Sequence, residues 1–197
     1  MLLLPRNLAK LADLAADETR LSLTGIRVLE YQDSYRLEAT DGRRLLIVRG
    51  PHNQRELTPQ DRLTAAALDD APDGKFVALV PAEDWAKAFK AAKKGESIGL
   101  VLGEEDLTFG TASQLLRTRQ VEGRFPDVNA VIPKKAPPFT IAVNPLLLAE
   151  LLTVMAQIAG EDERKVCLHF YGSKVPMGLS CKNAEGQFAD AILMPLM

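Results

Sequence analysis

A pattern that occurs three times in this chain limits its fold more than any other feature. Each copy has a short apolar stretch, then a proline, then apolar residues at helical spacing. The prolines at the expected helix starts are Pro5, Pro81 and Pro145. Proline suits the first helical position because its missing N–H has no partner within the helix there. The sequence therefore predicts three copies of one structural unit.

Segments in which apolar and polar residues alternate follow each predicted helix, and such alternation is typical of strands. The predicted strands lie within 24–32, 35–49, 97–102, 107–111, 115–121, 166–170, 175–182 and 189–195. Internal repetition of this kind is a strong indication of fold. We expect an α+β fold of three strand-helix-strand-strand-strand repeats, with the helices on one face of antiparallel sheets.

The repeats predict two domains. Repeats 1–50 and 75–134 are expected to form one domain, 1–134, and residues 138–197 a third repeat that amounts to half a domain. Residues 51–74 are polar, contain several prolines and show no strand alternation, so we interpret them as a connector with room for one short helix near 62–68.

Composition and termini exclude several classes of protein. The net charge of −2 argues against a protein whose whole surface coats nucleic acid, although a local basic face remains compatible with it. No apolar run reaches membrane-spanning length, and the first residues do not resemble a signal peptide, so we expect a cytoplasmic protein without a membrane partner. Cys167 and Cys181 are then expected to be reduced thiols in the core.

Motifs for catalysis, cofactors or metals are missing from the sequence. It contains no phosphate-binding glycine loop and no Cys-x-x-Cys pair, and its two histidines are His52 and His169. Cys167 and His169 lie two apart on one predicted strand and could form a nucleophile with its base, but a partly buried strand pair without a catalytic role is the favoured interpretation. The acidic run 161–163 is most simply a solvated loop. We expect no enzyme activity, cofactor or metal.

The stretch 116–134 has the most distinctive sequence. It alternates as a strand up to residue 121, and Gly123 and Pro126 then end the strand. A stiff crossing segment is expected next, with Phe125, Val128, Val131 and Ile132 available to pack beneath it. The string Val-Glu-Gly-Arg-Phe-Pro-Asp at 121–127, followed by Val-Ile-Pro at 131–133, closely resembles a segment of the bacterial DNA sliding clamp, the beta subunit of DNA polymerase III.

Two further motifs carry the same resemblance. Ala-Thr-Asp-Gly-Arg-Arg-Leu at 39–45 is similar to a clamp hairpin, with Arg43 where histidine is usual, and Ile-Leu-Met-Pro-Leu-Met at 192–197 is similar to the clamp's C-terminal tail. The resemblance implies the DNA-clamp, or processivity-fold, architecture. It also shows a departure, since bacterial clamps carry six such repeats per chain and this chain has three. The first two repeats resemble the middle clamp domain, and the third resembles the second half of the last domain.

Cationic residues form stripes on two of the predicted helices. Lys87, Lys90 and Lys94 are spaced by three and four residues, and Arg6 and Lys10 form a smaller stripe. A solvated helix face is the simpler interpretation from spacing alone. The resemblance implies that these cations face the phosphates of duplex DNA, a contact that reads charge and no base. No lysine or arginine occurs at 144–160, so the third helix has no such stripe.

The resemblance also implies an apolar groove that receives peptide motifs from polymerases and other partners. Its residues match the family positions one by one: Leu23, Thr40, Gly42, Arg43, Arg44, Leu45, Pro126, Val131, Pro176, Ile192, Met194 and Pro195. The alternative is that some of them are core between repeats.

The resemblance leads to two functional hypotheses. The first is a sliding-clamp-like processivity factor that encircles or holds duplex DNA and tethers replication and repair proteins through the groove. It would be a homo-oligomer, and a ring of twelve repeats would need four chains, a tetramer. The alternative is a peptide-binding adaptor, or clamp mimic, that does not encircle DNA.

Overall fold

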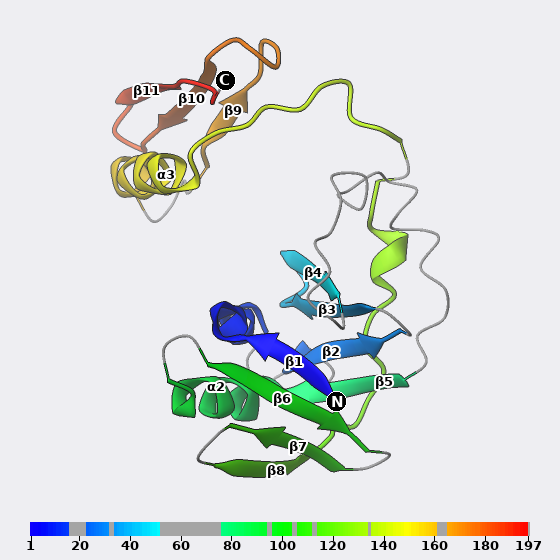
Figure 1. The fold of residues 1–197 in the computed structure, drawn as a ribbon. Helices are drawn as coiled ribbons and strands as arrows, with labels where there is room; N and C mark the ends of the chain where they lie inside the picture. The colour runs from blue at the N-terminus through cyan, green and yellow to red at the C-terminus, as the bar shows by residue number, and fades with distance from the viewer. Residues whose placement is uncertain are drawn as a thin grey trace. The chain divides into compact units, whose positions relative to one another are not determined.

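The computed structural model divides the chain into two compact units, Met1–Lys134 and Lys135–Met197, here named the N-terminal and the C-terminal unit (Figure 1). The residues that the structure describes are 1–15, 23–31, 34–51, 76–93, 96–103, 106–111, 114–133, 135–160 and 165–196. Lys94, most of the 51–74 connector, His52 and the acidic run 161–163 therefore lie outside the described residues.

The N-terminal unit contains two antiparallel four-stranded sheets. The first has the order β1-β6-β7-β8, with β1 (Leu2–Pro5), β6 (Ser97–Leu102), β7 (Asp106–Gly110) and β8 (Leu115–Arg119). The second has the order β4-β3-β2-β5, with β4 (Leu45–Pro51), β3 (Ser34–Thr40), β2 (Gly25–Glu30) and β5 (Phe76–Pro81). The strands that the sequence predicted are present, with bounds shifted by up to a few residues.

The two repeats of this unit exchange their leading strands. Strand β1 opens the first repeat but pairs with β6 of the second, with Leu3 opposite Gly99. Strand β5 opens the second repeat but pairs with β2 of the first, with Leu79 opposite Arg27. Each sheet is therefore completed by the other repeat.

Two helices follow the leading strands, and the first differs from its expected form. Residues Arg6–Leu14 form a 3-10 helix, η1. Leu8, Leu11 and Leu14 all pack into the core, and their spacing of three residues matches the three-residue turn of a 3-10 helix. The second helix, α2 (Ala82–Ala91), is an α-helix as expected.

The prolines lie slightly earlier than the sequence predicted. Pro5 and Pro81 are the N-caps of η1 and α2 and also end their strands. Only Pro145 lies in the first turn of its helix, where Asn144 supplies the cap by accepting a hydrogen bond from the Leu146 amide at 2.9 Å. A proline next to a helix start marks the boundary in all three repeats, but not the same position.

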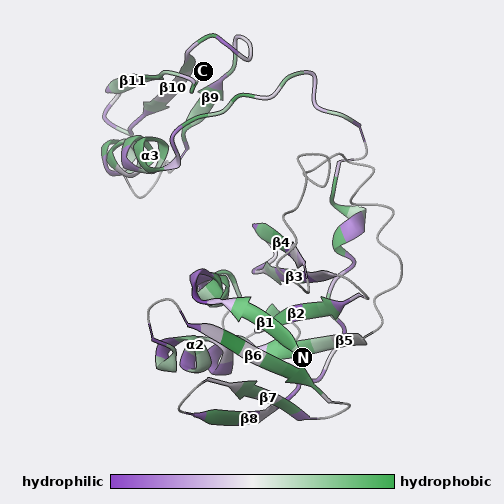
Figure 2. Ribbon diagram, viewed as in Figure 1, coloured by the Kyte–Doolittle hydropathy of each residue, from purple (hydrophilic) through white to green (hydrophobic). Residues whose placement is uncertain are grey.

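One core joins both sheets and both helices of the N-terminal unit. Trp85 on α2 is fully buried, stacks on Phe89 at 4.7 Å between ring centroids, and meets Phe109 of β7 edge-on at 6.0 Å. Its indole donates a hydrogen bond to the Leu8 carbonyl of η1 at 3.0 Å. Figure 2 shows the hydrophobic residues of β1, β2 and β5, which contribute to this core.

After β8 the chain crosses the second sheet. The strand ends at Arg119, and the amide of Val121 donates to the Leu79 carbonyl at 2.8 Å. A short 3-10 turn, η4 (Val128–Ala130), follows, and the Asp127 side chain caps it by accepting from the Asn129 amide at 3.1 Å. Val128 is buried as predicted, but Val131 is 71% exposed and does not pack beneath the segment.

The C-terminal unit combines one helix with one antiparallel sheet of order β11-β10-β9. Its elements are α3 (Pro145–Ala159), β9 (Cys167–His169), β10 (Met177–Lys182) and β11 (Phe188–Leu193). The strand predicted before α3 is absent from residues 140–144. A strand requires a partner ladder, whereas this segment is held by a bond from the Leu196 amide to the Ala142 carbonyl at 2.8 Å.

The two cysteines differ in burial, which corrects the prediction that both are core thiols. Cys181 on β10 is buried and its thiol lies 3.5 Å from the Met155 carbonyl, whereas Cys167 on β9 is exposed. Both are free. Among the described residues, no helix has the length and apolar character needed to span a membrane.

Candidate functional site

The described cations of the predicted DNA-facing set lie on two helices that pack against each other. Arg6 and Lys10 are on η1, and Lys87 and Lys90 are on α2. All four side chains are exposed. Lys87 and Lys90 are three residues apart and so share one stripe, opposite the face of α2 that is buried. The two stripes therefore lie on neighbouring helices at the surface.

Carboxylates lie beside two of these cations. The Lys10 ammonium is 2.8 Å from Asp13, and the Lys87 ammonium is 2.7 Å from Glu83 and 3.5 Å from Asp84. The hydrogen bond to Asp13 raises the pKa of Lys10, and the one to Glu83 raises the pKa of Lys87, so both stay charged at neutral pH. Exposed ion pairs of this kind are weak, and another anion can compete for the ammonium groups.

The β3–β4 hairpin places five of the predicted groove residues: Thr40, Gly42, Arg43, Arg44 and Leu45. The Thr40 hydroxyl accepts from the Gly42 amide at 3.0 Å and donates to the Arg44 carbonyl at 2.7 Å. Gly42 has a φ of 86°, a conformation that glycine adopts without strain. The turn is therefore closed by its own side chains.

Asp41 organises this hairpin, a role that its sequence motif alone did not indicate. Its carboxylate accepts from the amides of Arg43 and Arg44, each at 2.9 Å, and from the Arg44 guanidinium at 2.9 Å. The two backbone bonds, with a smaller contribution from Arg44, lower the pKa of Asp41 to about 2. Arg44 also donates to the Asp13 carbonyl at 3.1 Å, which ties the hairpin to the end of η1.

The outer face of the second sheet carries a buried polar cluster that the sequence analysis missed. Arg36, Glu38 and Thr40 alternate along β3 and are all buried. Glu38 is paired with Arg36 and, at 3.2 Å, with Arg27, while Arg36 donates to Asn129 of η4 at 3.2 Å. Burial raises the pKa of Glu38, and the two arginines oppose this shift. The alternation of charged residues within 34–40 was the available signal.

The remaining groove residues of the N-terminal unit differ in exposure. Leu23 is only 5% exposed, so in this structure it is core and offers no free wall for a ligand. Pro126 and Val131 are exposed and flank η4, which Asn129 connects to β3. The unit therefore presents the hairpin and the η4 region at its surface, whereas Leu23 is buried.

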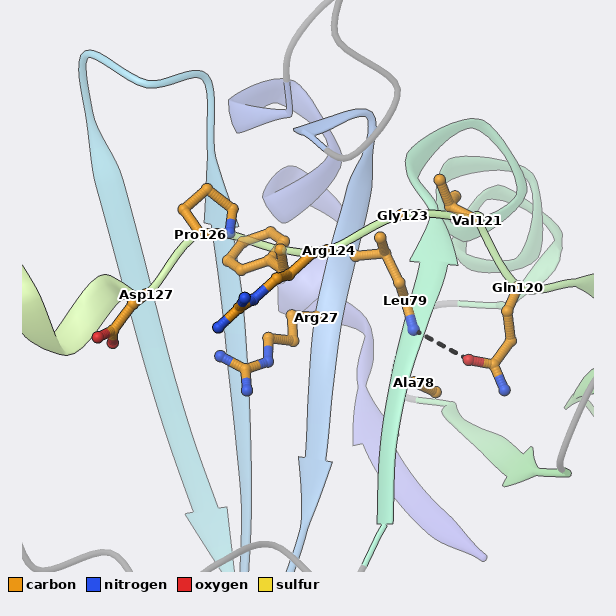
Figure 3. A pocket seen from close by; sticks show the side chains of 10 residues that line it. Arg27, Ala78, Leu79, Gln120, Val121, Gly123, Arg124, Pro126 and Asp127 are labelled. Atoms are coloured by element: carbon orange, nitrogen blue, oxygen red, sulfur yellow. Dashed lines mark hydrogen bonds between the residues drawn. The ribbon is translucent and has the colours of Figure 1, made fainter.

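A pocket of about 430 Å³ lies under the crossing segment. Its lining residues are Arg27, Ala78, Leu79, Gln120, Val121, Gly123, Arg124, Phe125, Pro126 and Asp127 (Figure 3). Arg27 extends from β2 with its guanidinium 5.9 Å from the Phe125 ring centroid, and the Leu79 amide donates to the Gln120 side chain at 3.4 Å. Of the predicted groove residues, Pro126 reaches this pocket.

The C-terminal unit contributes the other predicted groove residues. Ile192 on β11 and Met194 just after it are 66% and 65% exposed. Pro176 and Pro195 are half-buried in the same unit. Two apolar side chains are thus available to solvent next to the last strand.

The cysteine and histidine on β9 do not form a buried pair, which corrects that expectation, since both side chains are exposed. The His169 Nε2 lies 2.8 Å from the Ser180 hydroxyl. Within the residues that the structure describes, no three histidine, cysteine or carboxylate side chains come together as a metal site would require.

Comparison with known families decides the relationship of this chain. The model of the DNA polymerase III beta subunit, central domain, matches residues 9–127, which is more than half of the chain. The chain belongs to the DNA polymerase III beta subunit family. The predicted relationship to bacterial sliding clamps is confirmed, and a non-catalytic role accords with this family.

Curated relatives and solved structures agree with this membership. The beta sliding clamp of Synechocystis sp. is 29% identical over 124 residues, 61% of this chain and 30% of that protein. The beta sliding clamp of Synechococcus elongatus is 26% identical over 157 residues, 78% of this chain and 38% of that protein. This member of the beta-subunit family thus spans about a third of the length of these relatives.

The solved clamps confirm the fold. A beta sliding clamp from C. crescentus has a TM-score of 0.70 at 22% identity, covering 96% of this chain and 48% of that one. A DNA polymerase sliding clamp from Pseudomonas aeruginosa has a TM-score of 0.73 at 18% identity, covering 98% and 50%. The α+β fold that the repeats predicted and the clamp architecture that the resemblance implied are therefore both confirmed.

Proposed function

We propose that this chain acts as a sliding-clamp-like processivity factor. It holds duplex DNA without sequence preference and tethers replication and repair proteins through an apolar peptide-binding surface. The observation that carries the proposal is the exposure of Arg6, Lys10, Lys87 and Lys90 on two neighbouring helices. Ammonium and guanidinium groups on a regular scaffold suit phosphate contacts that read no base.

The proposed peptide-binding role rests on side chains available in each unit. The N-terminal unit offers the Asp41-closed hairpin, with Arg43 at its tip, and the exposed Pro126 and Val131. The C-terminal unit offers Ile192 and Met194. An apolar anchor of a partner peptide gains roughly 1.5–3 kcal/mol on burial, and a flexible thioether adapts to varied anchors.

Encircling DNA requires more than one copy of this chain. With three repeats in each chain, a ring of twelve repeats needs four chains. An odd number of repeats per chain would make neighbouring copies alternate in orientation, with two kinds of self-complementary interface. We therefore propose a homotetramer with dihedral symmetry.

A comparison of DNA topologies tests the encirclement. A closed ring slides off the ends of linear DNA but stays on a covalently closed circle. We expect the protein to co-purify with circular plasmid through a high-salt wash and to be lost after the plasmid is cut once. Equal retention on both forms would contradict encirclement and leave a simple electrostatic contact.

The adaptor that does not encircle DNA is the second candidate. One observation favours it: Asp13 lies beside Lys10, and Glu83 and Asp84 lie beside Lys87, so carboxylates offset the charge of two of the four described cations. This candidate predicts peptide binding without stable retention on circular DNA. The plasmid experiment and a peptide titration together separate the two functions.

A further inference from the structure

Two parts of the third repeat have no strand partner in the described structure. They are the segment before the helix, residues 140–144, here named the leading segment, and the outer edge of β9. In the N-terminal unit, each leading strand pairs with the first strand of the other repeat, β1 with β6 and β5 with β2. In the described part of the C-terminal unit, β9 pairs with β10 only, and residues 140–144 belong to no sheet. The ladder that joins two repeats is thus missing here on both sides.

The leading segment of the third repeat is nevertheless positioned like β5. Leu79 lies two residues before the helix cap Pro81, and its carbonyl accepts from the Val121 amide at 2.8 Å. Ala142 lies two residues before the cap Asn144, and its carbonyl accepts from the Leu196 amide at 2.8 Å. The same bond holds the segment in place in both repeats, so residues 140–144 are oriented to receive a strand.

Strand β9 corresponds to β6 in position but not in burial. Ile98 and Val166 each lie seven residues after the last helical residue, Ala91 and Ala159 respectively. Two residues later, Leu100 of β6 is fully buried, whereas Leu168 of β9 is 44% exposed. Since side chains two apart share a face, Leu168 points to the core side of its sheet and is left partly open to solvent there.

Helix α3 is also less buried than its counterpart α2. Counted from the helix start, Leu148 and Leu152 correspond to Trp85 and Phe89 of α2, which are at most 1% exposed. Both leucines are only half-buried. The bond from Trp85 to Leu8 shows that this side of α2 faces the helix of the other repeat. Glu150 is the single charged residue of α3, so the helix is suited to a buried position.

We propose that the C-terminal unit completes itself with the C-terminal unit of a second copy of this chain. Residues 140–144 of each copy pair with β9 of the other, and the two α3 helices pack across a two-fold axis. In the described part of the N-terminal unit, the equivalent edges of β2 and β6 are already occupied. The interface is self-complementary, as a two-fold dimer requires.

The N-terminal unit also fixes the register of this pairing. Leu79 is opposite Arg27, and Leu3 is opposite Gly99, in the two exchanged ladders. The equivalent pair in the dimer is Ala142 of one copy and Cys167 of the other. Backbone groups of Leu79 bond to residues 120 and 121 on the side away from β2. The pair is therefore of the non-hydrogen-bonded kind, with Cα atoms about 4.5 Å apart, which a disulfide can bridge.

This interface would be one of the two kinds of contact in the proposed ring. The inference is argued from the geometry of the repeats, so it does not depend on DNA binding. A first experiment uses the native Cys167 as a probe. The full-length Ala142→Cys variant is oxidised mildly and analysed on a non-reducing gel. We expect nearly complete conversion to a dimer band that disappears on reduction.

Two controls make the cross-link specific. The double variant Ala142→Cys, Cys167→Ser should lose most of the dimer band, because the predicted partner is gone. Glu185→Cys puts an exposed thiol in the β10–β11 turn, away from β9, and should give no more dimer than the parent. Equal cross-linking by Glu185→Cys, or none by Ala142→Cys, would overturn the proposed register.

A second experiment measures mass without cross-linking. Leu168→Glu puts a charge on a position that is partly exposed in a single copy but buried in the dimer, so light scattering should show the mass halved relative to the parent. Phe188→Glu is the matched control, since Phe188 is a 74% exposed strand residue on β11, and its mass should equal the parent's. A parent that stays monomeric at micromolar concentration refutes this inference.

The DNA measurement keeps the two proposals apart. If Leu168→Glu halves the mass but leaves binding to short linear duplexes unchanged, the interface is supported independently of DNA. If the parent is dimeric but binds no DNA, the inference stands and the proposed function fails. If the parent is monomeric and binds DNA, the dimer inference fails and the proposed DNA contact stands.

Discussion

The indole Nε1 of Trp85 donates a hydrogen bond to the backbone carbonyl of Leu8 at 3.0 Å, across the boundary between two repeats. η1 and α2, whose cations we assign to DNA, are joined at this point. The carbonyl belongs to a helix of the 3-10 type, and the indole is fully buried. The bond therefore aligns the two cationic stripes.

Trp85→Phe should destabilise the N-terminal unit by about 1–3 kcal/mol, because it removes the indole donor of a partly buried hydrogen bond to the Leu8 carbonyl. Urea unfolding followed by circular dichroism measures this. Leu115→Ala is the control, since that side chain is 71% exposed and its removal should change the unfolding free energy little. A Phe variant as stable as the parent would show that the bond contributes nothing.

Lys87→Ala with Lys90→Ala should weaken DNA binding and flatten its salt dependence, by about one unit of slope for each phosphate that is no longer neutralised. The double variant Arg117→Ala, Arg119→Ala removes the same charge from exposed positions on β8. Fluorescence anisotropy over a series of salt concentrations compares the two. If both variants change the slope equally, the helix stripe has no special role.

Ile192→Ala with Met194→Ala should abolish binding of a leucine-phenylalanine clamp-motif peptide and leave folding intact, because both side chains are largely exposed. These substitutions change side chains only, whereas deleting residues 194–197 would also remove the hydrogen bond from the Leu196 amide to the Ala142 carbonyl. Phe188→Ala is the control on the same strand. Peptide affinity equal to the parent's would remove these residues from the groove.

Asp41→Asn should destabilise the β3–β4 hairpin near neutral pH and have less effect in acid. The carboxylate's pKa is about 2 in the folded protein, below its ordinary value of 3.8, so its contribution is present above pH 3.8 and fades as the pH falls toward 2. Parent and variant unfolding curves should therefore converge over that interval. A constant difference from neutral pH to pH 2 would contradict this role.

The repeat pattern was enough to predict the elements but not their partners. The strand expected at 97–102 is observed with the same bounds, α2 follows Pro81, and α3 begins at Pro145. Periodicity describes one element at a time, however, so it could not reveal that β1 completes the sheet of the second repeat. For the same reason it predicted a strand before α3, where no ladder is available.

The candidate site was predicted by resemblance more than by physics. Matching positions identified Leu23 as a groove residue, but its burial depends on packing that no local pattern contains. The cluster of Arg27, Arg36 and Glu38 escaped notice because charged residues alternating on a strand normally indicate a solvated face. The crossing segment changes that environment by contacting Arg36 through Asn129 and Arg27 through Phe125.

The exchange of leading strands has a consequence for synthesis on the ribosome. Strand β1 leaves the exit tunnel well before its partner β6, which begins only at Ser97. Leu2 and Leu4 are fully buried in the folded unit, so they stay exposed to solvent while the chain between β1 and β6 is synthesised. The first sheet cannot close until the second repeat has emerged, so the N-terminal unit is expected to fold late and in one cooperative step.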